Sequence, residues 1–189
     1  MEEKVGKLIV IVAPSGTGKS SLMRRLKEED LLLDESISYT TRPIRPGETD
    51  GKDYFFVSQD EFKKMIDNDE FIEWFLVHGD YKGTSKKFVE KKVNKGHNLI
   101  FDLDIQGTDA MKKFFPHQAV AIFIKPPSFE VLKQRLEGRG TESKEALSIR
   151  LENAKKELER SDDFDHVVVN DDLDRAYEEL YGLVKKLIS

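Results

Sequence analysis

The chain has 189 residues, no cysteine and a formal net charge of −5 at pH 7. This length favours one domain with a substantial core, and the lack of cysteine excludes disulfide frameworks, cysteine-ligated zinc and thiol nucleophiles. The acidic balance argues against general nucleic-acid binding. No apolar run approaches the ~20 residues of a membrane span, and the acidic opening, Met1–Glu3, is unlike a secretory signal. We therefore expect a cytoplasmic protein that acts without a membrane, nucleic acid or an obligatory protein partner.

The first predicted element is a buried strand. Residues 7–12 form a short apolar run rich in β-branched side chains, and proline and glycine follow it. Such runs are typical of parallel strands that are buried on both faces. Leucine and methionine then recur with helical spacing between residues 19 and 29, which predicts a first helix.

The same strand-then-helix order recurs later in the chain. Apolar runs predict strands at 98–103, 119–124 and 166–169, and the segments after them predict helices at about 106–115, 128–137 and 172–188. This alternation predicts an α/β fold in which a parallel sheet carries helices on both faces. We expect a single domain, residues 1–189, with a core made of about 1–36, 98–134 and 164–189.

Two insertions interrupt this order. Residues 37–97 combine turn-forming sequences with strand-like pieces at 54–57 and 71–76, and they predict a small lobe of mixed structure. Within it, Ser58 and Glu61 have the spacing of a capping box, which predicts a helix up to about residue 68. Residues of about 135–163 predict a mobile lid, because glycines flank Arg139 ahead of a charged helix of about 144–160.

A phosphate-binding loop joins the first strand to the first helix. The run Ala13-Pro14-Ser15-Gly16-Thr17-Gly18-Lys19-Ser20 matches G-x-x-x-x-G-K-[ST], except that Ala13 stands where the first glycine is usual. The glycines allow backbone N–H groups to face phosphate oxygens, and the helix N-terminus adds positive potential. Lys19 is expected to reach the β- and γ-phosphates, and Ser20 to reach Mg²⁺. The loop therefore predicts that the α/β fold is of the P-loop NTPase type and that it binds a nucleoside triphosphate, but not which reaction follows.

Arginines and carboxylates cluster elsewhere in the chain. Arg42 and Arg45, stiffened by neighbouring prolines, form a candidate fork for one phosphate group. Glu73, Asp102 and Asp104 are carboxylates expected at the ends of strands.

With these motifs in order, the whole chain resembles the guanylate kinase family. The resemblance rests on the phosphate-binding loop and on T-T-R-x-x-R-x-G-E, G-x-D-Y-x-F, F-I-E-W, D-x-D-x-Q-G, R-L-x-x-R-G-T and V-N-D-D at 169–172. It implies transfer of the γ-phosphoryl group of ATP to GMP, giving ADP and GDP. It also implies that the inserted lobe holds GMP and that the lid covers ATP.

The resemblance assigns the GMP site residue by residue. Glu73 and Asp104 match carboxylates that accept hydrogen bonds from guanine N1–H and the N2 amino group, while Ser38 and Thr84 match hydroxyls on the base side. Arg42, Arg45 and Tyr54 match residues that hold the GMP phosphate. The chain departs from the family where Tyr-Tyr-Gly is usual, because it has Tyr81-Lys82-Gly83. We expect Lys82 to take over that phosphate contact; the alternative is that Lys82 points to solvent.

The resemblance also assigns the ATP side. Arg135, Arg139 and Arg150 match arginines around the ATP phosphates and are expected to act in catalysis with Lys19 and Arg42. Asn170 matches a position near the adenine. Asp102 resembles a carboxylate that holds Mg²⁺ through water, together with Ser20.

Other interpretations remain open at this point. One is a guanylate-kinase-like interaction domain that binds phosphopeptides, although such domains usually have a degraded phosphate-binding loop and this chain keeps Lys19 and Ser20. A second is another nucleoside monophosphate kinase or a shikimate-type kinase. Structural roles are also possible for single residues: Thr84 or one of the aspartates could cap a helix, and Glu73, Arg135 or Arg150 could be solvated surface residues.

Overall fold

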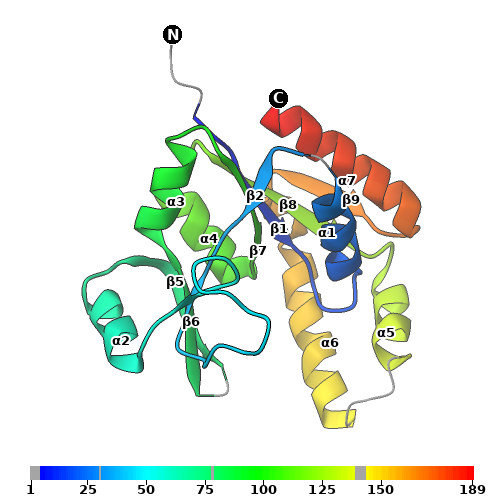
Figure 1. The fold of residues 1–189 in the computed structure, drawn as a ribbon. Coiled ribbons are helices and arrows are strands. Elements are labelled where there is room, and N and C mark those ends of the chain that lie inside the picture. The colour runs from blue at the N-terminus through cyan, green and yellow to red at the C-terminus, as the bar shows by residue number, and fades with distance from the viewer. Residues whose placement is uncertain (1–4, 30, 78, 139–143) are drawn as a thin grey trace.

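The computed structural model describes residues 5–29, 31–77, 79–138 and 144–189, and a five-stranded sheet lies at its centre. All neighbours in this sheet are parallel, in the order β2-β7-β1-β8-β9 (Figure 1). Its strands are β1 (Leu8–Val12), β2 (Leu33–Glu35), β7 (Asn98–Asp102), β8 (Ala119–Lys125) and β9 (His166–Val169). The predicted parallel sheet is confirmed. Among the strands of this sheet, the sequence failed to predict only the short strand β2.

Helices cover both faces of the sheet because alternate side chains of each strand point to opposite sides. One face packs against α1 (Lys19–Glu28) and α7 (Leu173–Ile188). The other face packs against α3 (Lys86–Val93) and α4 (Ile105–Phe114). Figure 1 shows these two pairs on opposite sides of the sheet. The fold is therefore the three-layered α/β arrangement that the alternation predicted.

A second sheet is mixed and has the order β4-β3-β6-β5. Its strands are β3 (Tyr39–Thr40), β4 (Phe55–Phe56), β5 (Phe71–Val77) and β6 (Asp80–Ser85). We call this sheet, with the helix α2 (Gln59–Asp67), the small lobe. Helix α3 also lies in the predicted insertion, but it packs on the five-stranded sheet, so the chain has returned to the core before residue 97.

Helix α2 begins where the sequence predicted. The Ser58 hydroxyl accepts a hydrogen bond from the Glu61 backbone N–H, and the Glu61 carboxylate accepts one from the Ser58 backbone N–H, which is a complete capping box. Phe62, one residue later, is fully buried. Its ring stacks on Phe71 with centroids 4.4 Å apart and on Tyr81 with centroids 5.2 Å apart, so it joins α2 to β5 and β6.

Two helices and a short turn lie on the side of the five-stranded sheet away from the small lobe (Figure 1). They are α5 (Phe129–Glu137), α6 (Lys144–Glu159) and the 3₁₀ turn Ser161–Asp163. Leu132 and Leu136 of α5 pack against Ala154 of α6. Most of the glycine-flanked segment predicted at 138–141 lies outside the described residues. Within the described ranges, no helix is both long and apolar enough to cross a membrane.

Replacing Phe62 by Ala tests how the small lobe is held together. Truncation of a fully buried Phe typically costs about 3–5 kcal/mol, so we expect urea denaturation to show a loss of that size in the free energy of unfolding. Lys63→Ala, at an exposed neighbouring position, is the matched control and should change it by less than about 0.5 kcal/mol. Equal effects of the two substitutions would contradict this role for Phe62.

Candidate active site

The phosphate-binding loop encloses a cavity of about 300 Å³ that Ala13 to Ser21 line continuously. Gly16 and Gly18 have φ values of 90° and 91°, a conformation that side chains disfavour. Positive φ at these positions lets successive backbone N–H groups turn inward toward a bound anion. The predicted loop is therefore present between β1 and α1, and Ala13 is accommodated in it.

A buried amide supports this loop from behind. Asn170 is 4% exposed, and its Nδ2 donates to the Thr17 carbonyl at 2.6 Å. A Cβ on Gly18 would lie 2.4 Å from the same Nδ2, so any other residue there would displace the Asn170 amide. Arg135 donates to the Asn170 carbonyl at 3.0 Å. Asn170 thus contacts the loop and links it to Arg135, a connection that the sequence did not predict.

Lys19 forms an ion pair with Asp102 across two neighbouring strands. The parallel register pairs Ile11 of β1 with Asp102 of β7, so the end of β7 lies beside the loop that follows β1. Ser20 is exposed, and the Asp102 side chain is 51% exposed. A hydroxyl and an accessible carboxylate are the oxygen ligands that Mg²⁺ prefers, with water in the other positions. These two residues therefore fit a nucleotide-bound Mg²⁺.

The predicted lid arginines have different positions. Arg150 of α6 donates to the Ser15 hydroxyl, which brings α6 onto the phosphate-binding loop. Arg135 lies in the last turn of α5 and makes the contact described above. Arg139 lies outside the described residues. Arg150 thus contacts the loop directly, and Arg135 is connected to it through Asn170.

A larger cavity of about 520 Å³ lies between the small lobe and the carboxyl ends of β2 and β7. Ligands of open parallel sheets bind in a crevice at this end of the strands. Most of the residues predicted for the GMP site line it, namely Ser38, Tyr54, Glu73, Lys82, Thr84 and Asp104. Asp102 lines it too, so this cavity adjoins the phosphate-binding loop through the Lys19–Asp102 pair.

Two carboxylates meet at one wall of the larger cavity. The Thr84 hydroxyl donates to Glu73 Oε1 at 2.8 Å, whereas Ser85, not Thr84, caps α3. Asp104 caps α4, because its Oδ1 accepts from the Gly107 N–H at 2.7 Å. A Cβ on Gly107 would lie 3.4 Å from that oxygen and 3.5 Å from Glu73 Oε2, so both carboxylates approach the start of α4 closely.

The environment of Glu73 favours its protonated form. Burial raises the pKa of the Glu73 carboxyl, and the negative charge of Asp104 raises it further. The hydrogen bond from Thr84 and the positive charge of Lys82 act in the opposite direction. A half-buried carboxylate with one hydroxyl partner has lone pairs left for a ligand that offers N–H groups.

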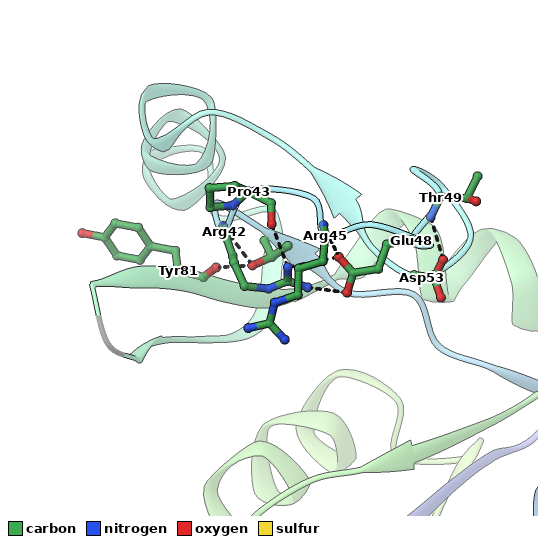
Figure 2. A network of polar contacts seen from close by, with 8 residues as sticks. Arg42, Pro43, Arg45, Glu48, Thr49, Asp53 and Tyr81 are labelled. Carbon is green, nitrogen blue, oxygen red and sulfur yellow. Dashed lines mark hydrogen bonds and ion pairs between the residues drawn. The ribbon is translucent and has the colours of Figure 1, made fainter.

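The arginine fork at the other end of the small lobe is held by a carboxylate. Both terminal nitrogens of Arg42 donate to Glu48, at 2.7 Å and 3.0 Å, and the Arg45 backbone N–H donates to the same carboxylate at 2.7 Å (Figure 2). The Arg42 hydrogen bonds lower the pKa of Glu48. Neither arginine lines the larger cavity in this structure.

Tyr54 connects this fork to the cavity. The centroid of its ring lies 5.4 Å from the Arg42 guanidinium carbon and 5.2 Å from Lys82 Nζ. Lys82 itself lines the cavity. The cationic groups of Arg42 and Lys82 therefore both lie near the Tyr54 ring, at the end of the larger cavity that faces the arginine fork.

Sequence reasoning missed three residues of the site. Glu48 lies in the predicted T-T-R-x-x-R-x-G-E motif, and its spacing from Arg42 could have indicated the pair. Glu157 of α6 has its pKa raised by burial, and it interacts with the charges of Lys19 and Asp104. Ser36 lines the larger cavity. No local pattern in the sequence marks Glu157 or Ser36, because the fold alone brings them to the site.

Comparisons with known proteins agree with this geometry. The family model described as guanylate kinase matches residues 5–187. Guanylate kinases of Geobacter sulfurreducens and Caldanaerobacter subterraneus are 47% and 46% identical over 182 residues each, which is 96% of this chain and 89% and 88% of theirs. A crystal structure of guanylate kinase from Anaplasma phagocytophilum superposes with a TM-score of 0.68 at 31% identity, over 97% of this chain and 86% of that one. The chain therefore belongs to the guanylate kinase family.

Proposed function

We propose that the two adjoining cavities hold the two substrates, with ATP phosphates in the loop and GMP in the larger cavity. As a member of the guanylate kinase family, the chain transfers the γ-phosphoryl group of ATP to GMP, which yields ADP and GDP. The observation that carries the proposal is the Lys19–Asp102 pair, because Lys19 lines one cavity and Asp102 lines the other. The donor and acceptor phosphates would meet at this pair.

Guanine would be read at the wall formed by Glu73 and Asp104. Guanine offers N–H donors at N1 and N2, and carboxylates accept from both. Ser38 and Thr84 would supply hydroxyls on the same side, with the Thr84 hydroxyl already orienting Glu73. Adenine would present an acceptor at N1 to a carboxylate, and an unpaired buried group of this kind can discriminate 10⁴-fold or more.

The GMP phosphate would bind at the end where Tyr54 lies. Arg42, Arg45 and Lys82 supply cations there, and the Tyr54 hydroxyl supplies a further donor. In the structure Arg42 is engaged by Glu48. Glu48 therefore holds the guanidinium in place, and a phosphate would be recognised by its remaining N–H groups and by Arg45.

The ATP phosphates would be held by the loop amides, Lys19 and the arginines of the lid. Arg150 already touches Ser15 of the loop. Arg135, Arg139 and Arg150 would surround the transferring group, and Asn170 would act through the loop that its amide supports. Residues of about 135–163 would serve as the lid of the single domain, residues 1–189. The GMP-binding lobe would lie in the insertion of about 37–97, apart from helix α3, which packs on the core.

Mg²⁺ is expected to accompany ATP, held by the Ser20 hydroxyl and, through water, by Asp102. When bound, such an ion neutralises charge on the phosphate oxygens. Lys19 would then leave Asp102 for the β- and γ-phosphates.

The chain's own part in catalysis is positioning and charge neutralisation. The acceptor phosphate is an anion near neutral pH, so no general base is required, and in-line geometry and the exclusion of water dominate. Lys19, Arg42 and the lid arginines would gather around the transferring group once both cavities are filled. Closure of the lobe and the lid would keep water away and prevent hydrolysis of ATP.

Lys19→Ala tests the assignment of the phosphate-binding loop. Loss of a cation aimed at the transferring group should lower kcat at least 10³-fold in a coupled ADP-release assay with ATP and GMP. Lys87→Ala, an exposed position on α3, should leave kcat unchanged. If Lys19→Ala keeps more than about a tenth of kcat, a loss below about 1.4 kcal/mol, the assignment is wrong. Parallel assays with AMP, CMP and UMP should give little turnover.

Glu73→Gln tests base reading and its pH dependence. The amide offers a donor where guanine needs an acceptor, so KM for GMP should rise about 10- to 100-fold. In the wild type, a proton on Glu73 blocks acceptance from guanine. Because burial raises the pKa of Glu73, KM for GMP should climb on the acid side at a pH above the ~4.3 of an ordinary glutamate.

Glu73→Gln should lack this acid-side rise, whereas Glu90→Gln on the exposed face of α3 should retain the wild-type profile. An unchanged KM for GMP in Glu73→Gln would show that this carboxylate does not read the base.

Lys82→Ala tests the phosphate end of the larger cavity. A charge-assisted hydrogen bond is typically worth ~1.5–3 kcal/mol, so KM for GMP should rise about 10- to 100-fold while KM for ATP stays constant. The contact should also weaken with salt, and Lys82→Tyr should lose that salt dependence. Lys52→Ala, exposed in the same lobe, is the control. Wild-type KM in Lys82→Ala would mean that Lys82 points to solvent when GMP binds.

A further inference from the structure

Ser36 occupies the connection between the five-stranded sheet and the small lobe. It follows β2, whose last residue Glu35 pairs with Ile100 of β7, and it precedes β3. Ser36 lines the larger cavity together with Ser38, two residues further on. Both hydroxyl-bearing residues therefore lie where the wall of the cavity passes from the core to the lobe.

The Ser36 hydroxyl has an unusual environment. Its Oγ is buried, and among the residues that the structure describes it is the one buried side-chain nitrogen or oxygen without a hydrogen-bond partner. Buried polar atoms in folded proteins nearly always have a partner, because leaving one unpaired destabilises the fold. An unpaired hydroxyl in the wall of a ligand cavity indicates a partner that arrives with the ligand.

The chemistry of the neighbouring groups indicates which part of the ligand this is. The carboxylates of Glu73 and Asp104 suit the N–H donors of guanine, at N1 and N2. Guanine also carries two acceptors on one edge, O6 and N7, and acceptors need donors such as hydroxyls. Ser38 supplies one hydroxyl for this edge, and Ser36 lines the same cavity with a second.

We propose that Ser36 is a further base-reading residue, whose hydroxyl rotates about the Cα–Cβ bond when GMP binds and donates a hydrogen bond to the O6–N7 edge of guanine. The inference rests on the base site proposed above. It gives the Ser36 hydroxyl its partner only in the GMP complex. Removal of the hydroxyl should therefore weaken GMP binding without lowering the stability of the protein in the absence of GMP.

Ser36→Ala provides the test. KM for GMP should rise about 5- to 30-fold, the effect of one lost hydrogen bond, with KM for ATP unchanged. The melting temperature of the ligand-free variant should equal or exceed that of the wild type, because the substitution removes an unpaired buried hydroxyl. Ser161→Ala is the control, since Ser161 is a buried serine whose hydroxyl contacts Asp162 and which does not line the cavity.

A second arm identifies the edge of the base. Inosine monophosphate lacks the N2 amino group but keeps O6 and N7. Its inhibition constant against GMP should therefore rise in Ser36→Ala by the same factor as KM for GMP. If the factor falls to one with inosine monophosphate, the hydroxyl meets the N2 amino group instead and the proposal fails.

Two further outcomes would overturn the role of Ser36. Wild-type KM for GMP in Ser36→Ala overturns the proposal, and so does a raised KM together with a lower melting temperature, which would assign the hydroxyl to the fold. Glu73→Gln, assayed in parallel, separates a failure of the proposed base site from a failure of the role proposed for Ser36. If Glu73→Gln weakens GMP and Ser36→Ala does not, the base site stands and only the role of Ser36 is wrong.

Discussion

The parallel pairing of β1 with β7 is the constraint on which the active site depends. All five residues of β1 are buried, so packing on both faces holds its register against β7. That register brings the end of β7 beside the phosphate-binding loop, and it makes the Lys19–Asp102 contact possible. The two cavities therefore share a boundary because two central strands end at the same edge of the sheet.

Opposite charges are distributed along this boundary in a way that suits two nucleotides. Lys19 is paired with Asp102, and Arg42 with Glu48. The carboxylate of Glu48 holds the Arg42 side chain in one place before any phosphate is present, which reduces the ordering required on binding. Asp102 keeps Lys19 beside the loop until ATP phosphates replace it as the partner of Lys19. A protein with a net charge of −5 can thus present cations where phosphates are expected.

Burial would give the proposed base end of the larger cavity its selectivity for guanine. Because Glu73 is largely shielded from water, its ionised form is destabilised and its pKa is raised. For the same reason, a polar ligand atom left without a hydrogen bond there would weaken binding. The Thr84 hydroxyl already supports Glu73, whereas the buried Ser36 Oγ has no hydrogen-bond partner within the part of the chain that the structure describes. A purine with a different pattern of donors and acceptors would leave such groups unpaired.

The sequence by itself determined the elements whose signals are local. These are the parallel strands, read from short apolar runs, the phosphate-binding loop, read from its glycines and Lys19, and the capping box of α2. The motifs also marked Glu73 and Asp104. Only the tertiary structure showed the short strands β2 and β3 and the polar strand β6, because such strands are stabilised by long-range pairing and not by their own composition. The tertiary structure alone also showed that Asn170 supports the loop and that Glu157 and Ser36 lie at the site. These positions depend on contacts between residues far apart in the chain, and such contacts exist only once the chain has folded.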